Sequence, residues 1–218
     1  MTVRASSRIA ALGGYAFAEV DRIVEELRAQ GAAVIDFGVG DPRAPTPELV
    51  RHEAKVALDR HATSGYPSYI GSANFRRAVA DWVGRRYGVT VDPAKHVSAT
   101  IGSKEAVFHA PLAFVDPGDV VISPDPGYPP YARGTTFAGG ENFRYPVRPG
   151  AGALPDLGAL PDDVLARTKM LWICYPNSPT GAVAPLEFFL EAARFCRERD
   201  ILLCSDEAYS EIWFEGGA

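Results

Sequence analysis

A carboxylate that directly follows an apolar run is the first feature of this 218-residue chain to suggest chemistry. Residues 201–205 (ILLCS) predict a strand that is buried on both faces of a parallel sheet, and Asp206 stands at its end. Open α/β sheets bind their ligands at the carboxyl ends of the strands. Asp206 is therefore either a residue that a cofactor contacts or an ordinary cap of a turn or helix, a role in which aspartate is common.

A possible anion site is the second candidate, at Gly102, Ser103 and Lys104. These residues follow a predicted strand over 96–101 and open a predicted helix over 105–115. Backbone N–H groups, a hydroxyl and the positive end of a helix dipole together suit a phosphate. Serine is also a good helix cap, so a purely structural role is the alternative. The stretch matches neither the Walker spacing nor the Gly-x-Gly-x-x-Gly dinucleotide pattern.

Two further loops carry aromatic or polar residues after predicted strands. Tyr128 lies in a turn over 124–131 whose prolines and glycine restrain the backbone, so its ring could be held as a stacking surface. A core aromatic in a loop is the alternative. Asn177 and Ser178 open the second loop. Because the carboxyl ends of parallel strands meet at one edge of a sheet, we expect all these residues beside Asp206.

The elements that must position these residues alternate between strands and helices in the second half of the chain. This alternation predicts an α/β fold with a mostly parallel central sheet and helices on both faces. The predicted strands cover residues 33–37, 96–101, 119–123, 142–147, 170–175 and 201–205. Apolar residues at helical spacing predict helices over 17–29, 46–60, 73–87, 105–115 and 185–199, with short helices after 124–131 and near Asp162. Ser72 is an expected helix cap, and Gly31 and Gly88 are expected helix ends.

Composition argues against several function classes. The net charge is −5 and the arginine-rich segments lie on amphipathic helices, which argues against a nucleic-acid-binding surface. The three cysteines show no metal-ligand spacing, so no metal site is predicted, and buried free thiols are expected. No stretch approaches the ~18 apolar residues of a membrane span, and the N-terminus lacks a signal-peptide pattern. The cytoplasm is the expected location.

Three stretches together resemble the aspartate-aminotransferase superfamily, the fold-type I pyridoxal-5′-phosphate (PLP) enzymes of classes I and II. They are IGSKEAVFHAPLAFVDPGDVVISPDPGYPPY at 101–131, YPNSPTGAV at 175–183 and LLCSDEAY at 202–209. The specific part is the combination of Asn-x-Pro-Thr-Gly with a later Ser-Asp-Glu-Ala-Tyr. The segment 13–47 is most similar to the LL-diaminopimelate aminotransferase branch. The resemblance implies the large PLP-binding domain of this fold, incomplete, together with the N-terminal part of a small domain.

The resemblance assigns cofactor roles that agree with the candidates above. It implies that Asp206 pairs with the pyridinium nitrogen, where a carboxylate keeps that nitrogen protonated. It implies that Tyr209 donates to the cofactor's phenolic oxygen and that Tyr128 stacks on the ring. Ser103 and Lys104 match the positions that contact the phosphate.

Substrate and subunit roles also follow from the resemblance alone. Tyr66 matches a tyrosine that reaches the phosphate of the neighbouring subunit, which implies a homodimer with shared active sites. Gly40 matches a glycine near the substrate carboxylate, and Tyr15 a substrate-side tyrosine of the diaminopimelate branch. The implied domain division places the N-terminal arm and the start of the small domain in residues 1–45, and the first part of the large domain in residues 46–218.

Two departures from the family pattern affect the expected site. The family carries asparagine immediately before Pro-Thr-Gly, where it donates to the phenolic oxygen, but this chain has Ser178 there and Asn177 one position earlier. Either side chain could take that role. The family's Schiff-base lysine lies beyond the Asp206 motif, and none of the lysines present matches its position: Lys55, Lys95, Lys104 and Lys169. No catalytic residue is therefore assigned, and residues 1–218 alone are predicted to be inactive.

The resulting hypothesis is a PLP-dependent aminotransferase that moves an amino group between an amino acid and a 2-oxo acid, with a diaminopimelate-type donor as one option. A PLP-dependent C–S lyase on the same fold is an alternative, because it would share the cofactor residues. A non-catalytic domain that binds a phosphorylated ligand or a protein partner is the alternative of another class.

Overall fold

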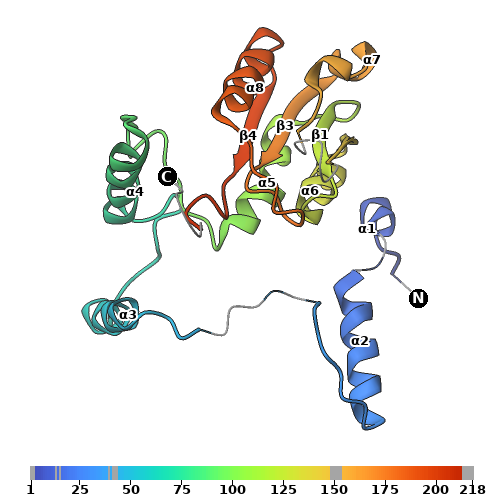
Figure 1. The fold of residues 1–218 in the computed structure, drawn as a ribbon. Coiled ribbons are helices and arrows are strands. Elements are labelled where there is room, and N and C mark those ends of the chain that lie inside the picture. The colour runs from blue at the N-terminus through green and yellow to red at the C-terminus, as the bar shows by residue number, and fades with distance from the viewer. Residues whose placement is uncertain are drawn as a thin grey trace. The chain divides into compact units, whose positions relative to one another are not determined.

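The computed structural model describes residues 3–12, 14, 16–38, 40, 44–147 and 154–212. The predicted substrate residue Tyr15 lies outside the described residues. The chain divides into two compact units: the first contains residues 1–12 and 101–218, and the second contains residues 13–100. Figure 1 shows the elements of both. The predicted division at residue 45 differs from this one and stays a prediction about the family's domains.

A parallel sheet forms the centre of the first unit. Its strands are β1 (Val120–Asp125), β2 (Glu141–Pro146), β3 (Thr168–Cys174) and β4 (Leu202–Asp206), in the order β2-β1-β3-β4. Figure 1 labels β1, β3 and β4. All neighbouring strands run parallel, and Asp206 is opposite Cys174 in the register of β3 and β4. The parallel sheet confirms the predicted fold class. Strands that helices bury on both faces read as continuous apolar runs, which is why the sequence indicated them.

Helices cover both faces of this sheet, as predicted. Alternate residues of β1 and β3 enter two separate clusters: Val120 and Ile122 pack with Phe188 of α8 (Leu186–Glu198), whereas Val121 packs with Val107 of α5 (Ser103–Phe114). The second cluster also holds Tyr131 from α6 (Pro129–Ala138). Three short helical segments complete the unit: α1 (Ser7–Ala11), η1 (Leu157–Ala159) and α7 (Asp162–Leu165).

The strand that leads to Asp206 is less buried than predicted. Leu202 is 39% exposed, and the rest of β4 is at most partly buried. The reason is position: β4 is the outermost strand on its side of the sheet within the described residues. The expectation of burial on both faces was therefore wrong for this strand, although β3 beside it is buried almost throughout.

The second unit contains α2 (Ala16–Ala29), α3 (Glu48–Arg60) and α4 (Ala73–Tyr87). Local signals explain the bounds of α4: the Ser72 hydroxyl oxygen accepts from the Phe75 N–H at 3.2 Å, and Gly88 ends the helix with φ +66°. The helix predicted from residue 46 begins at Glu48, and no side chain caps it.

Two predicted strands were wrong. Residues 33–37 and 96–101 form no strand in the structure. Phe37 is 94% and Ile35 82% exposed, so these apolar side chains are not packed within the part of the chain that the structure describes. The second run is tied by a backbone hydrogen bond from Ala99 N–H to Ile70 O, at 3.1 Å, but joins no ladder. An apolar run predicts a strand only where a neighbouring strand accepts it.

Candidate functional site

The carboxyl edge of the sheet gathers most of the predicted site residues of the first unit. Asp206 ends β4, the loop after β1 carries Tyr128, and the loop after β3 carries Asn177 and Ser178. These strands are neighbours in the sheet, so their carboxyl ends lie together. The structure thus places these four residues on the edge at which parallel sheets bind ligands.

A buried tyrosine holds the carboxylate at this edge. The Tyr131 hydroxyl donates to Asp206 Oδ2 at 2.8 Å. Burial of the ring, together with the hydrogen bond and charge of Asp206, raises the pKa of Tyr131 far above its usual range. The phenol therefore stays protonated and acts as a donor. Sequence reasoning missed this role, although Tyr131 lies three residues after Tyr128, on the same face of the turn that opens α6.

Aromatic rings fix Tyr131 in turn. Its ring stacks on that of Trp172, with ring centroids 4.8 Å apart and planes 19° apart. Tyr128 packs edge-on against Tyr131 at 5.8 Å. Tyr128 is only half-buried, so part of its ring remains accessible. The two prolines that open α6 stiffen this segment, which supports the predicted stacking surface better than the alternative of a fully buried core aromatic.

The side chain of Asn177 forms hydrogen bonds within its own loop. Its side-chain oxygen accepts from the backbone N–H of Thr180 at 3.3 Å and from the Thr180 hydroxyl at 2.7 Å, so the orientation of the amide is defined. Its Nδ2 is fully buried without a hydrogen-bond partner among the described residues. Ser178, by contrast, is partly exposed. Of the two residues before Pro179, Ser178 is thus the more exposed.

The N-terminus of α5 carries Ser103 and Lys104, both exposed. Gly102 is the N-cap, with φ +75°, and Glu105 Oε2 accepts from the Ile101 N–H at 2.5 Å. The alternative that Ser103 serves as the cap was therefore wrong. The end of α5 connects through residues 115–119 to the start of β1, so its beginning lies toward the carboxyl edge of the sheet.

Three further predicted residues are exposed. Tyr209 lies in the turn after β4 and is 41% exposed. Tyr66 and Gly40 belong to the second unit, where both are exposed.

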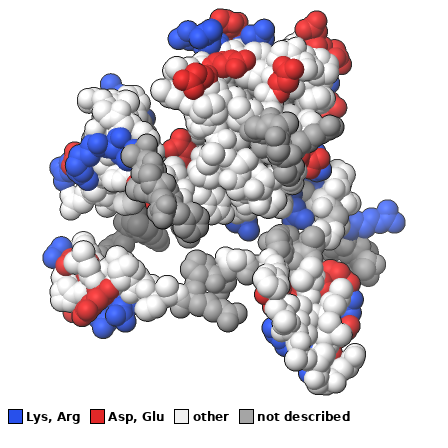
Figure 2. Space-filling view, in the orientation of Figure 1, with Lys and Arg blue, Asp and Glu red and all other residues white. Residues whose placement is uncertain are grey.

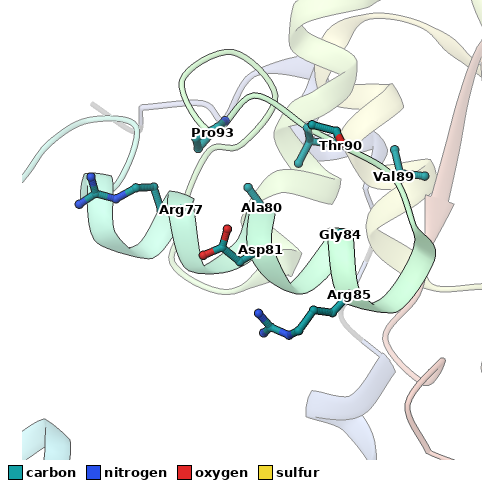
Figure 3. A pocket seen from close by; sticks show the side chains of 9 residues that line it. Arg77, Ala80, Asp81, Gly84, Arg85, Val89, Thr90 and Pro93 are labelled. Atoms are coloured by element: carbon teal, nitrogen blue, oxygen red, sulfur yellow. The ribbon is translucent and has the colours of Figure 1, made fainter.

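Each of the two units has a hollow on its surface. A hollow of about 380 Å³ in the first unit is lined by Tyr128, Arg133 and Arg144, among others. A hollow of about 460 Å³ lies wholly in the second unit and contains none of the predicted site residues. Figure 3 shows two residues that line this hollow, Arg77 and Asp81, on α4. The basic side chains of α4 appear in blue in Figure 2.

The described ranges contain neither a metal-binding cluster nor a helix that could span a membrane. No group of three or more His, Cys, Asp or Glu side chains is arranged to hold a metal ion there. None of the helices described is both long and apolar enough to cross a membrane.

The family model described as aminotransferase class I and II matches residues 32–217. The chain belongs to this family. It is 50% identical over 211 residues to the LL-diaminopimelate aminotransferase of Desulforudis audaxviator, covering 97% of this chain and 54% of that protein. It is 48% identical over 208 residues to the protein of the same name from Aquifex aeolicus, covering 95% and 54%. The chain spans about half the length of these relatives.

A solved aminotransferase has the same arrangement of elements. A single mutant of the Thermus thermophilus aspartate aminotransferase matches with a TM-score of 0.91 and 34% identity, covering 99% of this chain and 56% of that one. Membership of aminotransferase class I and II confirms the family resemblance and the fold-type I architecture. The identity to LL-diaminopimelate aminotransferases confirms the resemblance to that branch.

Proposed function

We propose that this protein acts as a PLP-dependent aminotransferase, which moves an amino group between an amino acid and a 2-oxo acid. The observation that carries the proposal is the carboxylate of Asp206, held by buried Tyr131 at the carboxyl edge of the sheet, in a chain of this family. The names of the most similar relatives favour a diaminopimelate-type amino donor.

The chemistry of the donor set fits PLP. A carboxylate suits a pyridinium nitrogen, a half-buried tyrosine ring suits stacking, and a helix N-terminus with a hydroxyl and an ammonium group suits a phosphate. When bound, PLP would supply an electron-accepting ring and an aldehyde carbon that carries the amino group between the two substrates.

Each residue of the set has a defined task in this proposal. Asp206 holds the proton on the ring nitrogen, and Tyr128 stacks on the ring. Ser103 and Lys104 bind the phosphate, assisted by the N-terminal N–H groups of α5. Tyr209 donates to the phenolic oxygen.

We assign the second contact to the phenolic oxygen to Ser178. Ser178 directly precedes Pro179, at the position of the family's asparagine, and is partly exposed, whereas the side-chain oxygen of Asn177 accepts from Thr180 and its Nδ2 is buried. A single hydroxyl offers one donor where the family's asparagine offers two, so this contact is weaker here. Asn177 instead closes the loop that presents Ser178, with its backbone N–H donating to Ala182 O at 2.7 Å.

The second unit contributes to the proposal through the family resemblance alone. Tyr66 is proposed to reach the phosphate in the neighbouring subunit of a homodimer, and Gly40 and Tyr15 to line the substrate side. A cytoplasmic location stays a prediction from the sequence. So does the inactivity of residues 1–218 alone, because no lysine in this segment matches the Schiff-base position.

The test uses the full-length protein, that is, the product of the complete reading frame that contains residues 1–218, with added PLP. We expect a new absorbance band from bound cofactor and amino transfer from LL-diaminopimelate to 2-oxoglutarate, with other amino acids as comparison donors. Release of pyruvate and ammonia from a sulfur amino acid, without amino transfer, would favour the C–S lyase. Absence of cofactor binding would overturn the proposal and leave the non-catalytic domain.

A further inference from the structure

One hydrogen bond connects the proposed cofactor edge to the interior of the first unit. It joins the Tyr131 hydroxyl to Asp206 Oδ2, and its two residues are 75 positions apart in the sequence. We propose that Tyr131 is a positioning residue: it holds Oδ2 so that Oδ1 is directed at the ring nitrogen. The inference rests on the proposed function and extends it to a residue that does not itself touch the cofactor.

Asp206 needs such a partner because its surroundings leave its carboxylate loosely restrained. It ends β4, the outermost strand of the described sheet, and is only half-buried. The terminal torsion of aspartate is broad, so an unrestrained carboxylate samples many orientations. A hydrogen bond to one oxygen selects a narrow range and leaves the other oxygen as the acceptor for a ligand.

Tyr131 is suited to this task because it is itself immobile. It is 1% exposed, its ring stacks on Trp172, and its backbone carbonyl accepts from the Thr135 hydroxyl at 2.8 Å. A donor fixed by packing loses little conformational entropy when it forms the bond. Since the phenol remains protonated, the direction of the bond does not change over the physiological pH range.

The neighbouring tyrosine Tyr145 gives a matched control. It is 3% exposed, and its hydroxyl donates to the backbone oxygen of Trp172 at 3.0 Å. Tyr145→Phe therefore removes a buried tyrosine hydroxyl and its hydrogen bond, as Tyr131→Phe does, but it does not involve Asp206. A difference between the two variants reports the link to the carboxylate and not the loss of a buried hydroxyl in general.

The experiment is a double-mutant cycle in the full-length protein, read as the apparent Kd for PLP by absorbance titration. We expect Tyr131→Phe to raise this Kd about tenfold and Tyr145→Phe to change it less than about twofold. In an Asp206→Ala background, Tyr131→Phe should have no further effect, because its target is gone. The induced circular dichroism per bound cofactor should fall in Tyr131→Phe, since the ring is held less uniquely.

The outcomes separate the inference from the proposed function. An equal effect of Tyr131→Phe with and without Asp206 would show a general structural role and overturn the inference, as would an unchanged Kd. Thermal unfolding of each variant shows whether the fold is weakened. For a weakened variant, the induced circular dichroism per bound cofactor is compared with that of the wild type: a lower value supports the inference, and an unchanged value overturns it. If the wild-type protein does not bind PLP, the proposed function itself fails, and the inference fails with it.

Discussion

The two units of this chain differ in what holds their elements in place. In the first unit, β1 and β3 are buried almost throughout, and apolar clusters pack against both faces of the sheet. In the second unit, α3 and α4 contain no buried residue, and Leu58 of α3 is 74% exposed. Burial thus specifies the first unit, whereas local capping signals bound α4 in the second, and α3 has neither a buried residue nor a side-chain cap. The proposed cofactor edge belongs to the unit that packs its own core.

The largest expected effect contrasts a core residue with an exposed apolar one. Ile173 of β3 is 0% exposed, so Ile173→Ala should lower the free energy of unfolding by about 3 kcal/mol. Leu58→Ala should change it by less than about 0.5 kcal/mol, because its side chain already contacts solvent. Urea unfolding of the full-length protein measures both. A comparable cost at Leu58 would break the comparison, by showing that another part of the assembled protein covers α3.

The second prediction contrasts two aspartates that end strands at the same edge. Asp206→Ala should reduce turnover at least about a hundredfold, because a proton on the ring nitrogen loses its charged partner. Asp125→Ala at the end of β1 should have little effect, since Asp125 is exposed and only approaches Arg144, at 4.0 Å. Steady-state rates with saturating PLP decide between them. Equal losses would refute the special role of Asp206.

The third prediction tests whether local signals dominate the second unit. Ser72→Ala removes the hydroxyl that caps α4 and should destabilise this helix by about 1 kcal/mol, more than Leu58→Ala affects α3. Hydrogen exchange of the amides in the first turn of α4 measures the change. Ser64→Ala, at an exposed serine outside the helices, is the control and should leave these amides unaffected.

The smallest effect concerns pH. Burial raises the pKa of the Cys196 thiol from 9.0 to about 11, so the folded state keeps a proton that the unfolded state releases. The contribution of the protonated, buried Cys196 thiol to the free energy of unfolding is complete below about pH 9 and is lost as the pH rises through about 11. Urea midpoints measured over this range should fall more steeply for the wild type than for Cys196→Ala. Identical slopes would contradict burial of this thiol.

The sequence predicted the first unit well because its apolar runs are themselves the core. The runs over 119–123 and 170–175 became β1 and β3, and the family motifs singled out Asp206 and left Asn177 and Ser178 as alternatives. Tyr131 was missed because its partner is distant in the sequence, and no local pattern reports such a hydrogen bond. The false strand over 33–37 failed for the opposite reason: its pattern was local, but a strand also requires a neighbour.

The register between β3 and β4 has a consequence for the chemistry of the protein. Side chains alternate between the faces of a sheet: Leu203 packs with the cluster of α8, whereas Cys204 packs with the cluster that contains Tyr131. A slip of β4 by one residue would turn Asp206 toward the α8 face, out of reach of the tyrosine. Such a slip would also turn Leu203 out of its own cluster. Packing of Leu203 against the α8 cluster thus helps to select the register in which Asp206 reaches Tyr131, at the opposite face of the sheet.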